Sequence, residues 1–223
     1  MLQITNIPTE QTTAATDALL AILAFIVTIK VNQSGKGIDL IKTRIWTWVF
    51  GLLTFASADG AIAHGFQMSK LTKSVLWQPL NLSLVLTICL FAAGVIYDLK
   101  KFRLPKALIP VLLVCAIIFF AITVILPDAL TTIFIKVEAI AMVFAFVAYT
   151  ILALRKTIKG AGLMAAGILI TIIAAVIQAI HTIKVMVIWE FDHNGIFHIV
   201  QMMGVIFLFQ GLQRELKSRG TRK

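Results

Sequence analysis

Seven long apolar segments run through this chain of 223 residues. A helix needs about 20 apolar residues to cross the hydrocarbon core of a bilayer, and each segment reaches or approaches that length. The segments cover residues 15–31, 44–66, 76–97, 106–126, 131–154, 161–183 and 192–212. We therefore expect an all-α, polytopic membrane protein with seven transmembrane helices.

The composition agrees with this interpretation. Apolar residues make up 60% of the chain and charged residues 13%, which excludes a disordered, collagen-like or disulfide-stapled chain. The connections are short, so we expect one transmembrane domain over residues 1–214 and a basic tail over residues 215–223. No Lys or Arg precedes the first segment, unlike a cleaved signal peptide, so we expect this segment to stay in the mature protein.

The basic residues predict the orientation. Sixteen of the twenty Lys and Arg residues lie in four segments that fall on one side of a seven-span chain: residues 30–44, 98–106, 155–159 and 214–223. Cytoplasmic loops carry the excess of positive charge, so this side is expected to be cytoplasmic. The amino terminus is then outside and the carboxyl terminus inside, in the cell (inner) membrane. The net charge of +10 indicates orientation and contact with membrane lipids, and we expect no nucleic-acid partner.

The polar residues inside the apolar segments concentrate near the outer side, and intramembrane ionisable groups are functional candidates by default. All four histidines lie there, whereas the inner halves of the segments are expected to be almost pure hydrocarbon. The candidates, in chain order, are Ser57, Asp59, His64, Asn81, Glu138, His181, Asp192, His193, Asn194 and His198.

Helical spacing predicts which of these share a face. Ser57 and His64 are seven residues apart and nearly superpose at 100° per residue, and His198 lies on the stripe that begins at Asn194. His193 sits at the expected helix start, so three imidazoles, His64, His193 and His198, are able to converge. Three imidazoles and one open position describe a catalytic zinc site, which activates water.

The remaining candidates receive roles around this predicted zinc site. Asp59 and Asp192 are candidate proton carriers and Ser57 a further catalytic group. The predicted substrate contacts are Asn81, Asn194, Glu138 and His181. Simpler readings remain open: Asp192 as a helix N-cap, His181 at the lipid interface, and Glu138 paired locally.

The segment Gly60-Ala-Ile-Ala-His64 on the second span and Asp192-His-Asn-Gly-Ile-Phe-His198 on the seventh resemble the motifs of the CREST superfamily. This superfamily includes the alkaline ceramidases and adiponectin-receptor-like proteins. The resemblance implies three histidine ligands for zinc and hydrolysis of a lipid amide or ester. It departs at Gly60, where the family has serine, at Asn81 in place of the third-span aspartate, and at Asn194, where the family has the first histidine of HxxxH.

We therefore expect a zinc-dependent membrane hydrolase that acts on a lipid amide or ester. The first alternative is a receptor or sensor that binds a ligand in the same polar site without turnover. The second is a small transporter, which the expected apolar inner halves disfavour. A retinal protein is not expected, because the seventh span has no lysine for a Schiff base.

Overall fold

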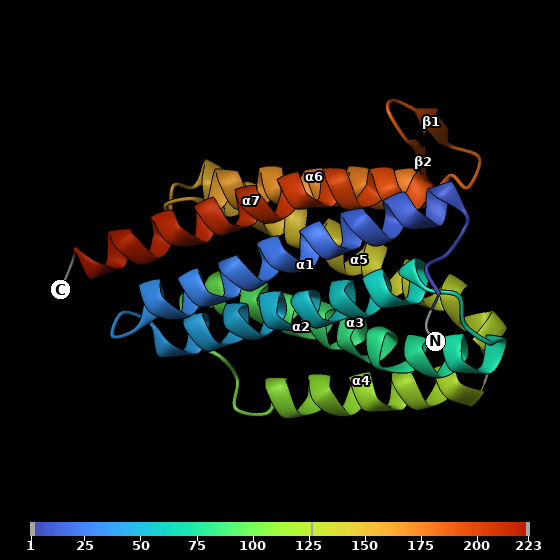
Figure 1. Cartoon of the computed structure of the whole chain (residues 1–223). Coiled ribbons are helices and arrows are strands. Elements are labelled where there is room, and N and C mark those ends of the chain that lie inside the picture. The colour runs from blue at the N-terminus through green and yellow to red at the C-terminus, as the bar shows by residue number, and fades with distance from the viewer. Residues whose placement is uncertain (1–2, 126, 222–223) are drawn as a thin grey trace.

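The structure, a computed structural model, describes residues 3–125 and 127–221. Seven helices and one two-stranded hairpin make up the described part of the chain (Figure 1). They are α1 (Pro8–Gly35), α2 (Leu40–Gly65), α3 (Lys70–Leu99), α4 (Leu108–Ile125), α5 (Pro127–Leu154), α6 (Ala161–Ala179), β1 (Lys184–Met186), β2 (Glu190–Asp192) and α7 (His193–Gly220).

The predicted all-α fold is confirmed, and a helix lies at each of the seven predicted segments. Six of the described helical stretches are long and apolar enough to cross a membrane: α1, α2, α3, residues 135–154 of α5, α6 and α7. The described apolar stretch of α4, Leu108–Ile122, is shorter.

Side-chain caps fix where several helices begin. Asp39 accepts a hydrogen bond from the backbone N–H of Lys42 at the start of α2, and Ser69 accepts one from Thr72 at the start of α3. Asp192 accepts the N–H of Gly195 at 2.9 Å, which confirms the N-cap reading of this residue. Each cap satisfies a backbone donor that has no partner within its own helix.

The helices pack as a bundle in which α1 lies between α2 and α7 (Figure 1). α3 packs beside α2, α6 packs on α7, and α4 lies at the edge against α3 and α5. Trp46 is fully buried in the core, where its ring contacts Phe50 and Phe91 at centroid distances of 5.9 and 5.1 Å. The core therefore has a large aromatic centre between α2 and α3.

Glycines bring α6 and α7 into close contact. A Cβ at Gly167 would lie 2.9 Å from the carbonyl oxygen of Gly204, and one at Gly211 would lie 2.9 Å from that of Gly160. Each helix of the pair thus presents glycines seven residues apart. Small residues allow this approach of two backbones, which membrane helices use for association.

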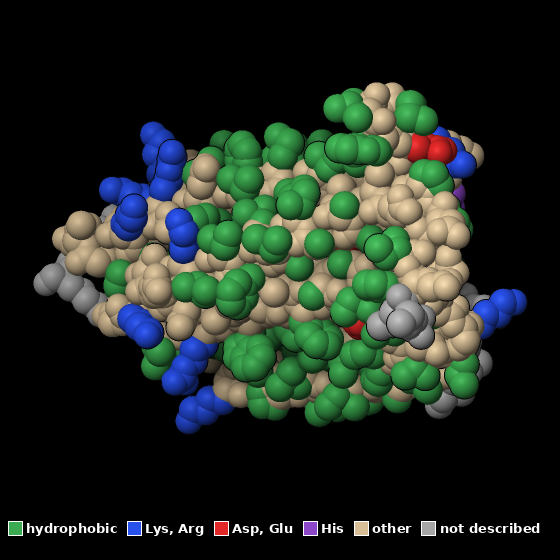
Figure 2. Space-filling model, in the orientation of Figure 1, with side chains coloured by type: hydrophobic (Ala, Val, Ile, Leu, Met, Phe, Trp, Pro, Cys, Tyr) green, Lys and Arg blue, Asp and Glu red, His purple; other side chains and the backbone are tan. Residues whose placement is uncertain are grey.

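The two ends of the bundle differ in chemistry. The end of α7 (Figure 1) and most of the visible Lys and Arg side chains (Figure 2) lie at one end of the bundle, which we call the basic end. The opposite end, where α1 and α7 begin, carries the hairpin and is called the histidine end (Figure 1). The hairpin was not predicted: α6 ends at Ala179, before the expected end of the sixth span at residue 183, and β1 begins at Lys184, directly after that span.

Candidate functional site

A carboxylate and an imidazole pair inside the bundle near the histidine end. The Oδ1 atom of Asp17 on α1 lies 3.1 Å from Nε2 of His198 on α7, and the two side chains are 7% and 8% exposed. At this distance the two groups form an ion pair when His198 is protonated and Asp17 is not. Burying such groups away from water is costly, and it is typical of functional positions in membrane helices.

The second ring nitrogen of His198 is also engaged. Nδ1 lies 3.1 Å from the hydroxyl of Thr16, which itself lies 2.9 Å from the carbonyl oxygen of Thr13 and 3.0 Å from that of Thr12. The hydroxyl of Thr16 has one proton and donates it to one of these carbonyl oxygens. In the contact with His198 the hydroxyl therefore accepts, so we assign the proton to Nδ1 of His198. Both ring nitrogens of His198 thus have a partner on α1.

A further contact ties the start of α7 to the same helix. The hydroxyl of Thr13 donates to Oδ1 of Asp192 at 2.9 Å, and the same oxygen caps α7 through Gly195. Thr13, Thr16 and Asp17 therefore form one face of α1 that holds the first turns of α7. We call Thr13, Thr16, Asp17, Asp192 and His198 the α1–α7 cluster.

Helix α2 packs directly against the α1–α7 cluster, because its residue at the point of contact, Gly60, has no side chain. A Cβ at Gly60 would lie 2.8 Å from Oδ2 of Asp17, closer than real atoms approach. Gly60 thus leaves the room that the carboxylate occupies.

His64, the predicted second-span ligand, forms a separate pair. Its Nδ1 lies 2.7 Å from Oε2 of Glu10 on α1, and its ring contacts the edge of Trp77 at a centroid distance of 5.4 Å. Both side chains are partly exposed, and Lys73 lies 3.8 Å from the same carboxylate oxygen.

Besides the hydroxyl of Thr47, three buried carboxylate or amide oxygens have no hydrogen-bond partner among the described residues: Asp59 Oδ2, Gln78 Oε1 and Gln201 Oε1. They belong to α2, α3 and α7, and each lies within about two turns of the histidine end of its helix. A buried acceptor without a donor costs about 1–3 kcal/mol. These oxygens are therefore suited to receive donors from a ligand.

The other predicted residues are distributed around this region. Ser57 is buried on α2, whereas Asn81 on α3 and Glu138 on α5 are half-buried. Asn194 accepts a hydrogen bond from Gln178 at 3.3 Å. No hydrogen bond or ion pair in the described part of the chain joins Ser57, Asn81 or Glu138 to the α1–α7 cluster.

The three predicted zinc ligands do not meet in this arrangement. His193 Nε2 lies 3.2 Å from Nδ1 of His181, on the exposed side of the site, while His198 is taken up by Thr16 and Asp17. Among the described residues, no group of three or more His, Cys, Asp or Glu side chains is placed to hold a metal ion. The residues as arranged do not form the three-histidine site, and zinc binding stays a prediction.

Sequence reasoning missed the partners on the first helix, which are Glu10, Thr13, Thr16 and Asp17. One signal was present: Glu10 and Asp17 are seven residues apart and share a helical face, and Asp17 falls inside the first apolar segment. An acid at that depth is by itself a functional candidate.

The expectation of almost pure hydrocarbon toward the basic end was wrong. Lys42 on α2 and Asp98 on α3 form a buried ion pair at 2.8 Å, and the hydroxyl of Tyr149 on α5 donates to the same carboxylate at 2.8 Å. The charges are tolerated because they neutralise each other. The halves of the helices toward the basic end thus do contain polar residues, so a transporter is no longer disfavoured on that ground.

A second carboxylate joins α3 and α7 beside this pair. Asp39 accepts hydrogen bonds from Tyr97 and from Arg219, and Arg219 also donates to Glu215 at 2.7 Å. The guanidinium of Arg219 lies over the ring of Phe102. In contrast to Asp59, the carboxylates of Asp98 and Asp39 have several donors each, as expected for a structural network.

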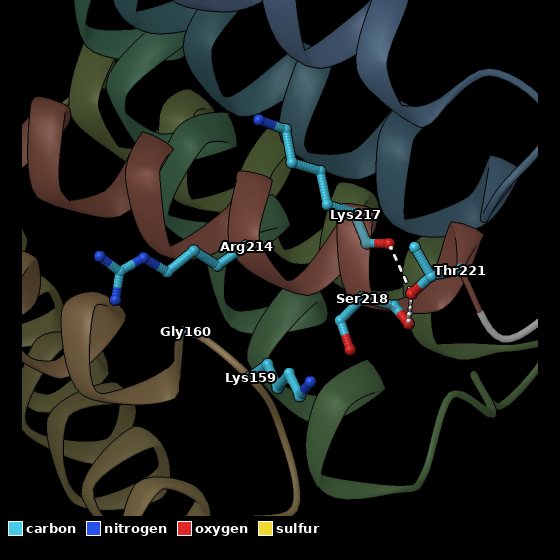
Figure 3. A pocket seen from close by; sticks show the side chains of 6 residues that line it. All are labelled: Lys159, Gly160, Arg214, Lys217, Ser218 and Thr221. Atoms are coloured by element: carbon cyan, nitrogen blue, oxygen red, sulfur yellow. Dashed lines mark hydrogen bonds between the residues drawn. The ribbon is translucent and has the colours of Figure 1, made fainter.

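A hollow of about 490 Å³ also lies at the basic end (Figure 3). Its lining comes from the two residues before α6 and from the C-terminal end of α7 with the residue that follows it: Lys159, Gly160, Arg214, Lys217, Ser218 and Thr221. The side chains of Arg214, Lys217 and Lys159 point in different directions (Figure 3). The hollow is therefore a basic surface without a shared focus for its cations.

The chain belongs to a family of unknown function, DUF6962, whose model matches residues 12–217. No curated protein and no solved structure matches the chain. The matched region includes every residue of the α1–α7 cluster and of the Lys42–Asp98 ion pair, and it begins just after Glu10.

Proposed function

We propose that the histidine end of this membrane protein binds the polar part of a lipid amide or ester and hydrolyses it. The observation that carries the proposal is the Asp17–His198 pair, buried between α1 and α7 at 3.1 Å. A carboxylate and an imidazole this close together supply both a base and an acid at one point.

The unpartnered oxygens of Asp59, Gln78 and Gln201 support the binding step. Amide lipids and hydroxylated lipids carry N–H and O–H donors next to a long apolar chain. Such a donor group would satisfy buried acceptors, while the apolar chain remains in contact with the helices and the bilayer. A lipid is therefore the ligand class that suits both the polar cluster and its surroundings.

The proposed chemistry starts with Asp17 deprotonated and His198 protonated. Asp17 takes a proton from water as the water oxygen bonds to the acyl carbon. His198 gives its Nε2 proton to the leaving nitrogen or oxygen as the bond to the acyl carbon breaks. The proton taken up by Asp17 then passes to His198 across the 3.1 Å contact, and a fatty acid and an amine or alcohol leave.

Zinc remains a prediction from the family resemblance and takes no part in this proton balance. Binding by His64, His193 and His198 together would require the contact between His181 and His193 to open. Elemental analysis of the purified protein, compared with His64→Ala and His193→Ala, tests it. Stoichiometric zinc that falls in both variants would support the three-histidine site, and no zinc in the parent protein would reject it.

We further propose an orientation with the histidine end outside and the basic end in the cytoplasm of a cell (inner) membrane. The gathering of Lys and Arg at the basic end supports it (Figure 2). A reporter fused after Lys223 should be active only in the cytoplasmic compartment. Activity of an extracytoplasmic reporter at the same position would reverse the orientation.

One observation favours binding without hydrolysis as the second candidate. Both ring nitrogens of His198 are engaged by the protein, as in a structural or sensing site. Purified protein in nanodiscs made from an extracted lipid mixture distinguishes the two functions by mass spectrometry. Release of free fatty acid by the parent protein, lost in Asp17→Asn, supports hydrolysis. A specifically retained lipid without product supports the receptor.

A further inference from the structure

The hairpin between α6 and α7 has an unusual tip. Strands β1 and β2 pair in antiparallel register, with Lys184 opposite Asp192 and Met186 opposite Glu190. The connection is Val187-Ile188-Trp189, closed by a hydrogen bond of 3.2 Å from the N–H of Val187 to the carbonyl of Trp189. Hairpin turns in water normally use Gly, Asn, Asp or Pro, and this connection contains none of them.

The tip is also strongly exposed. The exposed fractions are 70% for Met186, 72% for Val187, 77% for Ile188 and 65% for Trp189. Four successive large apolar side chains with such exposure are unfavourable in water, and contiguous apolar patches mark contact surfaces. The four apolar side chains of the tip are therefore expected to lie in an apolar environment.

The place of the hairpin identifies that environment. It projects sideways from the histidine end, next to the end of α6 and the start of α7 (Figure 1). An exposed apolar stripe runs along α6 toward the same end and consists of Leu169, Ile173, Val176 and Ile180, spaced three or four residues apart. On a helix that is long and apolar enough to cross a membrane, this stripe faces lipid.

The base of the hairpin has the opposite character. Lys184 and Glu190 form a pair at 3.8 Å, and the carbonyl oxygen of Glu190 accepts a hydrogen bond from Thr12 on α1 at 2.8 Å. Residue 192 of β2 is the N-cap of α7. The hairpin is thus held to α1 and α7 at its polar base, while its apolar tip is left free to contact its surroundings.

We propose that the tip, Met186–Trp189, inserts into the interfacial region of the bilayer leaflet at the histidine end. The occupant of its apolar surface is lipid. Trp189 has the ring that is typical of the interface between acyl chains and head groups, and the charged base remains at the level of the head groups. The proposal depends on the membrane location of the helices and is independent of hydrolysis.

Fluorescence quenching of Trp189 tests this proposal in the intact protein. The emission that belongs to Trp189 is the difference between the parent protein and Trp189→Phe, both in nanodiscs. Phospholipid brominated near the start of the acyl chain should reduce this emission by about half or more, because an inserted ring lies at that depth. Aqueous acrylamide should quench it much less.

Two results would overturn the proposal. Strong quenching by acrylamide with none by brominated lipid would put the tip in water. Protection from both quenchers would put the tip against protein, for instance a second copy of the chain. Trp77→Phe is the control variant for the difference method. Because Trp77 packs on His64, the emission difference between Trp77→Phe and the parent protein belongs to a ring that contacts protein. Trp189 is exposed, so Trp189→Phe should keep the thermal stability of the parent protein.

Discussion

Asp17 on α1 lies so close to Gly60 on α2 that an added Cβ would come within 2.8 Å of its carboxylate oxygen. The same carboxylate contacts His198 through its other oxygen. Asp17 is therefore held between two helices, and its position depends on the missing side chain of α2.

We predict that Gly60→Ala displaces Asp17 from His198. The expected result is a loss of about 1–3 kcal/mol of stability, the range found when extra methyl groups overfill a packed site. Thermal unfolding in detergent measures it. The control is Gly162→Ala on α6, where an added Cβ meets nothing within 4 Å. Equal stability of Gly60→Ala and the parent protein would show that Asp17 is not confined by α2.

His198→Ala should destabilise the protein by about 3–5 kcal/mol, because it leaves a buried carboxylate without its partner. The double variant Asp17→Asn/His198→Ala should recover part of this loss, since no unpaired charge remains. The difference from additivity, measured in a double-mutant cycle, gives the coupling between the two residues. Additive effects would mean that they do not interact.

The Lys42–Asp98 pair predicts a different pattern. Asp98→Asn should cost about 3–5 kcal/mol of stability because Lys42 loses its counter-charge in a buried position. Lys42→Met/Asp98→Leu should be much closer to the parent protein. Urea or detergent unfolding compares them. If the pair is purely structural, the folded double variant should retain lipid turnover. Loss of turnover would instead give the pair a functional role.

The glycines between α6 and α7 provide a test of the packing. Gly204→Leu should prevent the approach of the two backbones, since even a Cβ would lie 2.7 Å from the hydroxyl of Thr171. We expect loss of folded protein or a strong decrease in the unfolding temperature. Met203→Leu is the matched control, because position 203 is exposed. Unchanged stability of Gly204→Leu would contradict the close contact.

The helices could be predicted from sequence because each apolar segment is a local signal. The cap at Asp192 was predictable for the same reason, since it bonds only three residues ahead. Asp17 and His198 are separated by most of the chain, and no local pattern pairs them. Their contact depends on α1 packing between α2 and α7, which apolar content does not determine.

The ion pair near the basic end was missed because of small errors in helix boundaries. The second segment was expected to begin at residue 44, whereas α2 begins at Leu40 and carries Lys42 into the core. The third was expected to end at residue 97, whereas α3 continues to Leu99 and includes Asp98. Shifts of two to four residues thus turned buried charges into apparent loop charges.

The most direct test of the central proposal is lipid hydrolysis by the purified protein in nanodiscs, followed by mass spectrometry of released fatty acid. The parent protein should release product, and Asp17→Asn should reduce the rate by about 100-fold or more, the range expected when an acid–base group is removed. Lys42→Met/Asp98→Leu should keep the parent rate. Absence of product from a folded parent protein, or an unchanged rate in Asp17→Asn, would contradict hydrolysis at the Asp17–His198 pair.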